Sequence, residues 1–273
     1  MADSKSKFLV RVVSALAAAI MVLSIDYFFG PRGLVFICTI AIVLGVREYS
    51  RMAFRPTDGL PYLGHIYWAL CLLAFVGMFL RQDPLLVLAV VNVAFMSFTI
   101  WFTRGHITNE KLLNALALAS FGMTYCVLFP YFALKIVNLE NGEHWFLFLL
   151  FVVFFGDIFA YFAGRWFGER KFMPLISPNK TWAGAVGGLL GSALAGTIYL
   201  FTALGVDPWL TIPFCVICGA AAQSGDLLVS LVKRVAQVKD SGSIMPGHGG
   251  ILDRLDGVYI ACPLVYAFAL FIS

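Results

Sequence analysis

Charged residues are scarce in this chain, and no long polar stretch interrupts it. Asp, Glu, Lys and Arg make up 12% of its 273 residues, whereas 61% are hydrophobic. A soluble domain carries about 25% charged and about 45–50% apolar residues, so water alone cannot be the solvent for this surface. The composition excludes an ordinary soluble globule. It predicts an all-α integral membrane protein in which residues 1–273 form one polytopic domain in a lipid bilayer.

Two further absences, and the placement of the positive charge, narrow the possible functions. No G-x-x-x-x-G-K-[ST] pattern occurs, so the chain has no Walker A loop. No second C-x-x-C pair accompanies Cys215 and Cys218. Because all six cysteines fall in apolar stretches, we interpret them as packing residues and not as a metal or redox site. The net charge of +4 resides in short loops, which indicates membrane topology and no binding of nucleic acid.

Apolar stretches near the length that crosses a bilayer, about 20 residues, recur along the chain. Nine spans are predicted, the second of them short as drawn: Phe8–Phe28, Gly33–Val46, Tyr62–Leu80, Leu85–Phe102, Leu112–Ala133, Trp145–Gly164, Ala183–Leu204, Pro208–Leu231 and Leu255–Ile272. The first span follows a polar start and lacks a clear cleavage motif. We therefore expect it to be retained rather than removed as a signal peptide.

Basic residues fall almost entirely into alternate loops. With the N-terminus inside, only Arg32, Arg81 and Lys135 of the 19 Lys and Arg residues lie in outer loops. The positive-inside rule therefore predicts an inner N-terminus and, after nine spans, an outer C-terminus. Residues 1–140 have few polar residues within their spans and are predicted to be scaffold. Residues 145–273 contain two polar inner loops and are predicted to hold the catalytic spans.

Four aspartates lie inside or beside the later spans: Asp157, Asp226, Asp253 and Asp256. Ionisable residues are costly in lipid and mark functional interiors. At 1.5 Å per residue, Asp157 and Asp226 lie roughly 12 and roughly 10 Å from the inner ends of their helices, and the other two open the last span. Three helices are thus predicted to bring carboxylates to the inner third of the membrane, a ligand type suited to Mg²⁺. Alternatively, each acid pairs with a nearby Lys or Arg and only holds the bundle together.

Spacing within the helices groups these acids with polar neighbours. Asp157 and Tyr161 are four residues apart, so they share a helix face. Asp226, Ser230 and Lys233 stand at i, i+4 and i+7, again on one face. We therefore expect two helices to present polar stripes to the interior of the bundle.

The inner loop at residues 232–254 combines charged side chains with turn-forming residues. Its polar members include Lys233, Arg234, Lys239, Asp240, Ser241, His248 and Arg254. Glycines let the backbone approach a bound group, and N–H groups in such turns form anion sites together with cations. For His248, metal ligation, phosphate contact and turn capping all remain open.

The second polar inner loop leads directly into the seventh span. Ser177, Lys180 and Thr181 precede a helix whose N-terminus points inward, where free N–H groups attract anions. The alternative is that a Ser or Thr merely caps the helix. The acids and both loops together predict a site for an acidic, phosphorylated substrate and a divalent metal at the inner membrane boundary.

The run from Ser230 to Asp256 resembles the signature of the phosphatidate cytidylyltransferases (CDP-diglyceride synthases). The matching positions are Ser230, Lys233-Arg234, Lys239-Asp240, Pro246-Gly-His248-Gly-Gly, Asp253-Arg254 and Asp256. The Ser177-Pro-x-Lys180-Thr181 segment and the run from Gly156-Asp157 to Gly164-Arg165 also resemble family motifs. The chain departs from the family pattern at Val229, where Glu is common, and at Met245 and Ala183. In the N-terminal half the resemblance rests on hydropathy alone.

The resemblance implies a nucleotidyltransferase that transfers CMP from CTP to phosphatidate, giving CDP-diacylglycerol and pyrophosphate for phospholipid synthesis. It implies one or two Mg²⁺ ions held by Asp226, Asp253 and Asp256, and catalytic roles for these three and for Lys233, Lys239 and His248. The implied substrate-binding residues are Ser177, Lys180, Thr181, Arg234, Asp240, Ser241, Arg254, Asp157 and Tyr161. A multi-pass protein of the bacterial cytoplasmic (inner) membrane is also implied, with its site facing the cytoplasm, and so is a homodimer.

Two other functions compete with this one. A CTP-dependent polyprenol kinase resembles the family distantly and would transfer the γ-phosphate, but the full signature around His248 favours the cytidylyltransferase. A membrane transporter would also use intramembrane acids, yet no internal repeat is evident and the polar residues favour one face. The D-G-x-x-A-R run of the CDP-alcohol phosphotransferases is absent.

Overall fold

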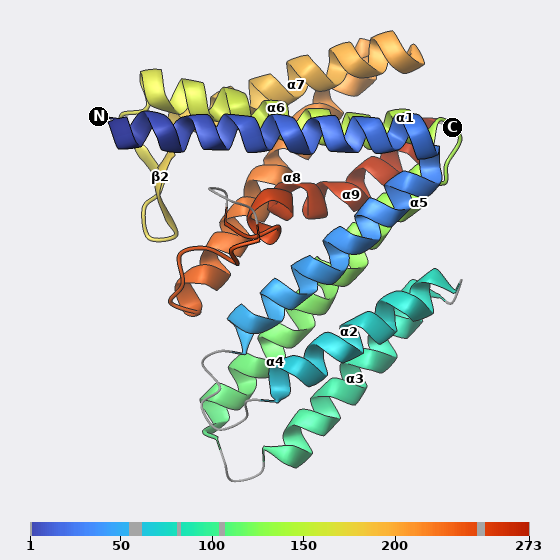
Figure 1. Ribbon diagram of the computed structural model, residues 1–273, viewed down its shortest axis with the longest axis vertical. Coiled ribbons are helices and arrows are strands. Elements are labelled where there is room, and N and C mark those ends of the chain that lie inside the picture. Colours follow the sequence, from blue (N-terminus) through green and yellow to red (C-terminus); the bar gives the residue numbers. More distant parts are fainter. Residues whose placement is uncertain (1, 55–61, 81–82, 104–106, 245–248, 273) are drawn as a thin grey trace. The chain divides into compact units, whose positions relative to one another are not determined.

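Helices make up most of the computed structural model, which describes residues 2–54, 62–80, 83–103, 107–244 and 249–272 (Figure 1). The elements in chain order are α1 (Ala2–Ala53), α2 (Leu63–Phe79), α3 (Pro84–Phe102), α4 (Asn109–Met123), the π-helix η1 (Thr124–Leu128), α5 (Phe129–Val137), α6 (Gly142–Phe167), β1 (Lys171–Met173), β2 (Ser177–Thr181), α7 (Trp182–Leu204), α8 (Pro208–Val235) and α9 (Leu252–Ile272). Within the described residues, seven helical stretches are long and apolar enough to cross a membrane, and α2 is apolar but shorter. A helical, multi-pass membrane protein is thereby confirmed, while the number of nine spans stays a prediction.

The first two predicted spans are the two arms of α1. The helix is broken at Gly30, whose φ of 55° and ψ of −145° are not helical, and the ribbon of α1 turns sharply in Figure 1. Glycine adopts a positive φ without steric cost, and Pro31 follows it with no N–H to donate. A backbone kink therefore stands where the sequence predicted a short loop.

The chain divides into two compact units. The first unit contains residues 1–17, 37–131 and 232–254. Within it, the Tyr49 hydroxyl donates to the carbonyl of Leu118 over 2.7 Å, and the Tyr67 hydroxyl donates to the carbonyl of Ala119 over 3.1 Å. Both tyrosines are almost fully buried, at 1% and 0% exposed. These bonds fix the later arm of α1 and helix α2 to α4.

The second unit contains residues 18–36, 132–231 and 255–273. Helices α6 and α7 pack closely there because small residues line their contact. A Cβ added to Gly156 would lie 2.4 Å from the Ser192 hydroxyl oxygen, and one added to Gly188 would lie 3.1 Å from the carbonyl oxygen of Gly156. Such close approach of backbones is typical of helix pairs in membranes that meet through small residues.

A short β-hairpin precedes α7 in a segment that the sequence predicted to be a loop. Strands β1 and β2 pair antiparallel, with Lys171 opposite Thr181 and Met173 opposite Ser177. The predicted site residues Ser177, Lys180 and Thr181 therefore lie on strand β2. The hairpin fixes them directly before the first turn of α7.

Candidate active site

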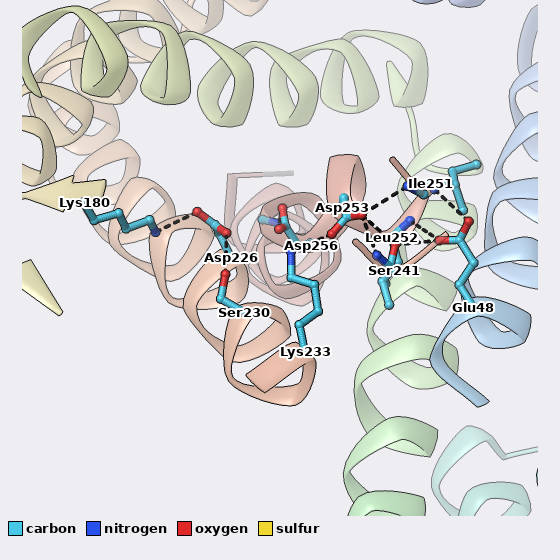
Figure 2. A network of polar contacts seen from close by, with 12 residues as sticks. Glu48, Lys180, Asp226, Ser230, Lys233, Ser241, Ile251, Leu252, Asp253 and Asp256 are labelled. Carbon is cyan, nitrogen blue, oxygen red and sulfur yellow. Dashed lines mark hydrogen bonds and ion pairs between the residues drawn. The ribbon is translucent and has the colours of Figure 1, made fainter. Parts of the chain in front are cut away.

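Two polar clusters hold many of the predicted site residues, one cluster in each unit (Figure 2). The loop cluster, in the first unit, consists of Glu48, Lys233, Ser241 and Asp253. The hairpin cluster, in the second unit, consists of Lys180, Gln223, Asp226 and Ser230. Helix α8 carries members of both clusters.

Asp253 lies in the first turn of α9 and accepts four hydrogen bonds. Its Oδ1 accepts from the Lys233 ammonium over 2.6 Å. Its Oδ2 accepts from the Ser241 N–H over 2.8 Å, from the Ser241 hydroxyl over 2.9 Å and from the Gly250 N–H over 3.1 Å. A carboxylate is stabilised at a helix N-terminus by the free N–H groups and the helix dipole. Asp253 thus ties two points of the loop between α8 and α9 (residues 236–251, the polar loop) to the start of α9.

Lys233, in the last turn of α8, is the cationic partner in the loop cluster. The Lys233 and Asp253 side chains are 15% and 7% exposed, so removal of either one would leave a poorly solvated charge. The end of α8 also borders a shallow surface hollow of about 330 Å³, open to solvent and lined by Lys233, Arg234, Gln237, Val238 and Lys239. Three cationic side chains around one hollow suit the binding of a phosphate group.

Glu48 completes the loop cluster, and the sequence analysis missed it. Its side chain lies in α1 and the residue is 3% exposed. Its carboxylate accepts from the Ser241 hydroxyl over 2.9 Å and from the N–H groups of Ile251 and Leu252 over 3.1 and 3.0 Å. An acid near the end of an apolar span was the signal that singled out the later aspartates. The same signal could have found Glu48, but this residue lies in the half that was read as scaffold.

In the hairpin cluster, Lys180 reaches from β2 to α8. Its Nζ lies 2.8 Å from Asp226 Oδ2 and donates to the Gln223 carbonyl over 3.2 Å. The Ser230 hydroxyl donates to Asp226 Oδ1 over 3.3 Å, which confirms that these two residues share a helix face. The side chains of Lys180 and Asp226 are 25% and 39% exposed, so solvent screens this pair more than the pair in the loop cluster.

Thr181 caps helix α7. Its hydroxyl, in a residue that is 6% exposed, accepts from the Gly184 N–H over 3.1 Å. The structure thus shows the capping role that the sequence had left open as an alternative. The cap places Lys180 immediately before the helix N-terminus.

Asp256 is buried in α9, at 8% exposed, and its Oδ1 accepts from the N–H of Gly257 over 2.8 Å. Within the second unit, α8 and α9 meet here, because a Cβ added to Gly225 would lie 2.3 Å from the carbonyl oxygen of Asp256. Gly225 directly precedes Asp226. The close contact therefore brings together the backbones that carry the Asp226 and Asp256 carboxylates.

Other predicted site residues lie at exposed positions. Asp157 is exposed on α6, and the Tyr161 hydroxyl, on a side chain that is also exposed, accepts from Arg165 over 3.0 Å. Their place in a polar cavity stays a prediction. Four charged residues in or near the polar loop are exposed as well: Arg234, Lys239, Asp240 and Arg254. His248 lies outside the described residues.

The oxygen atoms of the hairpin cluster fit the requirements of Mg²⁺ better than those of the loop cluster. Among the described residues, no three His, Cys, Asp or Glu side chains form a group that could hold a metal ion. Mg²⁺ needs only one or two carboxylates when substrate phosphates complete its shell. Asp226 is partly open and already lies against the Lys180 ammonium, so a cation is accommodated there. The Asp226 oxygens also have donors, Ser230 and Lys180, but this side chain is 39% exposed. Asp253 is 7% exposed, and its Oδ2 alone accepts three hydrogen bonds.

Sequence comparisons place these clusters in a known family. A model of the cytidylyltransferase family matches residues 9–272. A phosphatidate cytidylyltransferase of Rickettsia bellii is 31% identical over 201 residues, which are 71% of this chain and 84% of that protein. Phosphatidate cytidylyltransferases of Brucella abortus and Staphylococcus saprophyticus are each 43% identical, over 122 and 127 residues.

The stronger matches are also the shorter ones. The Brucella match covers 45% of this chain and 45% of the relative, and the Staphylococcus match covers 46% and 49%. The chain thus spans about half the length of these two relatives. The family model, in contrast, covers almost every residue, including those of both clusters. On this evidence, the chain belongs to the cytidylyltransferase family.

Proposed function

We propose that the chain transfers CMP from CTP to phosphatidate, giving CDP-diacylglycerol and pyrophosphate. The observation that carries the proposal is the loop cluster, in which Lys233 and Asp253 form a mostly buried ion pair within the run that resembles the family signature. Membership of the cytidylyltransferase family supports it, as do the names of the relatives.

In the proposed reaction, an oxygen of the phosphatidate phosphate attacks the α-phosphorus of CTP. The bond between that phosphorus and the oxygen bridging to the β-phosphate breaks, and pyrophosphate leaves with the electron pair. The phosphate nucleophile is already ionised near neutral pH, so no general base is required. Such transfers depend mainly on positioning and charge neutralisation.

Cationic side chains of the chain would supply that neutralisation. Lys233 and Lys180 each hold a carboxylate, at 2.6 and 2.8 Å, and an incoming phosphate oxygen can accept a remaining proton of the same ammonium group. We assign the same role to three exposed cations, Arg234, Lys239 and Arg254. In this proposal Ser177 and Lys180 on β2 contact phosphate oxygens directly before α7, whose N-terminus favours an anion.

We assign Mg²⁺ first to Asp226; ligand roles for Asp253 and Asp256 rest on the family resemblance alone. The ion, when bound, would screen the repulsion between two anionic substrates. The protein's own part is to hold Asp226 with Ser230 on one helix face, beside the Lys180 ammonium. Chelation by EDTA should abolish turnover, and added Mg²⁺ should restore it. Undiminished turnover in EDTA would show that the reaction needs no Mg²⁺ and would refute this assignment.

We further propose nine crossings, with the N-terminus inside and the site facing the cytoplasm of a bacterial inner membrane. The two arms of α1 on either side of Gly30 would each cross, as would the shorter α2. A Lys135→Cys variant tests the orientation, because all six native cysteines are buried and Lys135 is exposed. An impermeant maleimide should label this variant from outside intact cells. Labelling only after lysis would show that the orientation is opposite to the one proposed.

A homodimer is part of the proposal on the family resemblance alone. Mass measurement of the detergent-solubilised protein tests it. A single monomeric species at all protein concentrations would remove the dimer.

The decisive assay uses purified protein in detergent with CTP, Mg²⁺ and phosphatidate. We expect pyrophosphate and a CDP-lipid. A well-folded sample that forms no CDP-lipid would overturn the proposal. Release of CDP with a newly phosphorylated lipid, when a polyprenol is supplied, would indicate the kinase instead.

A further inference from the structure

Glu48 is a buried carboxylate whose hydrogen bonds with described residues all lead to the polar loop and the start of α9. It is 3% exposed and accepts from Ser241, Ile251 and Leu252 over 2.9 to 3.1 Å. Figure 2 shows the carboxylate turned toward these groups. A buried charge persists only where donors surround it, so the fit between Glu48 and the loop is specific.

Two of these donors belong to the N-terminus of α9. Leu252 is the first residue of that helix, and the first N–H groups of a helix have no partner within it. Glu48 satisfies the N–H groups of both Ile251 and Leu252. A carboxylate from α1 therefore acts as the cap of a helix that begins about 200 residues later, next to Asp253.

The third donor links Glu48 to the ion pair. The Ser241 hydroxyl lies 2.9 Å from Glu48 Oε2 and 2.9 Å from Asp253 Oδ2, so its proton is shared between two carboxylates. Asp253 in turn holds Lys233 at 2.6 Å. A continuous chain of bonds thus runs from α1 through Ser241 to the lysine at the end of α8, all within the first unit.

Two glycines of the loop make room for the Glu48 carboxylate. A Cβ added to Gly242 would lie 2.3 Å from Oε1, and one added to Gly250 would lie 2.2 Å from Oε2. No side chain fits at that distance, so the backbone itself lies against the carboxylate. On the other side, the hydroxyl of the next residue, Tyr49, anchors α1 to α4. The carboxylate is therefore held on a fixed support.

We propose that Glu48 is a positioning residue that sets the geometry of Ser241, Asp253 and Lys233 for the reaction. It does not touch substrate; it orders the loop and the first turn of α9 from the half of the chain that the sequence presented as scaffold. This inference rests on the proposed function for its effect on turnover. The ordering of the loop can be measured without any activity.

The variant Glu48→Gln tests the proposal with almost no change in shape. A glutamine offers one oxygen where Glu48 offers two. In one orientation of the amide its NH₂ group faces the N–H of Ile251, and in the other it faces the N–H of Leu252. One buried donor is left without a partner. We expect amide hydrogen exchange in the peptide that contains Ile251 and Leu252 to become about tenfold faster or more. Turnover should fall about 10- to 100-fold, because small misplacements of reacting groups are costly.

Two controls distinguish positioning from general destabilisation. Ser50→Ala removes a hydroxyl from a residue that is 4% exposed on the same helix and bonds only to the Arg47 carbonyl among the recorded contacts. It should leave exchange at residues 251–252 and turnover unchanged. In Glu48→Gln itself, exchange in the first turn of α7, capped by Thr181, should stay at the wild-type rate.

A double variant adds a second readout. Because Glu48 is proposed to act on the reaction through Asp253 and Lys233, Glu48→Gln combined with Asp253→Asn should lose little more turnover than Asp253→Asn alone. Three results would each overturn the proposal. The losses of turnover in the two single variants could multiply in the double variant, or Glu48→Gln could speed amide exchange in α7 as much as at residues 251–252. Glu48→Gln could also leave both exchange and turnover at the wild-type level. A wild-type protein without CDP-lipid formation would refute the proposed function, while the exchange data would still decide whether Glu48 orders the loop.

Discussion

Replacement of Asp253 by asparagine removes the ion pair of the loop cluster with little change in shape. The amide oxygen can still accept from the Ser241 and Gly250 N–H groups, which leaves the NH₂ group facing the Lys233 ammonium. Lys233 is 15% exposed in its side chain, so it becomes a poorly solvated charge without its partner. Breaking a buried pair from one side costs about 3–5 kcal/mol, and the long lysine stem can turn toward water. We therefore expect a loss of about 3 kcal/mol in the free energy of unfolding.

The same change should lower turnover by about 100-fold or more, because Lys233 loses the partner that holds it in place for the proposed phosphate contact. The assay is CDP-lipid formation, run beside thermal unfolding of the same detergent sample. Asp207→Asn is the matched control, since Asp207 accepts from the Trp209 N–H over 2.8 Å at the start of α8 and has no recorded ion pair. Asparagine caps helices as well as aspartate does, so this variant should be near wild type in both measurements.

A second change separates stability from catalysis. Lys233→Met in the Asp253→Asn background removes the stranded ammonium, and most of the lost stability should return because neither partner is then left unpaired. Turnover should stay low, because the proposed phosphate contact is missing. Near-normal turnover in Asp253→Asn, or recovery of turnover in the double variant, would refute the assignment of this pair to the reaction.

Two predictions concern the second unit. Asp226→Asn should cost less than about 1 kcal/mol in stability, because its pair with Lys180 is partly exposed and screened, yet it should abolish turnover; full activity would mean that the metal is misplaced. Gly225→Ala should separate α8 from α9, because its Cβ would lie 2.3 Å from the Asp256 carbonyl oxygen. Such overpacking costs about 1–3 kcal/mol. A control glycine must have an ordinary backbone conformation, which excludes Gly205 with its φ of +67°. Gly219→Ala, which meets the Ser192 side chain instead of backbone, should be milder, and equal effects would contradict the reasoning.

The helices could be predicted from the sequence because hydropathy is a local property. The predicted spans 145–164, 183–204 and 208–231 lie within α6, α7 and α8. A loop was predicted where the helix is kinked at Gly30, because apolar runs on both sides of a Gly-Pro step do not show whether a helix ends or bends there. The β1–β2 hairpin left no hydropathy signal either, since its strands are short and polar.

The site was predicted as far as helix spacing reaches. The i, i+4 rule placed Asp226 and Ser230 on one face, and the hydrogen bond between them confirms it. Asp226 and Asp253 each pair with a lysine, as the alternative reading of the acids expected, while their catalytic role stays a prediction. Spacing could not reveal these pairs, because the partners come from different elements. Glu48 and Ser241 are separated by 193 residues, and no local pattern records a contact over that distance.

The central claim is that the chain transfers the CMP group, and labelled CTP tests it most directly. Purified protein should be given CTP labelled at the α-phosphate, or at the γ-phosphate, with phosphatidate and Mg²⁺. The account predicts that the α-label enters the lipid and the γ-label is released in pyrophosphate. Transfer of the γ-label to a lipid, or no lipid labelling by a folded sample, would contradict it.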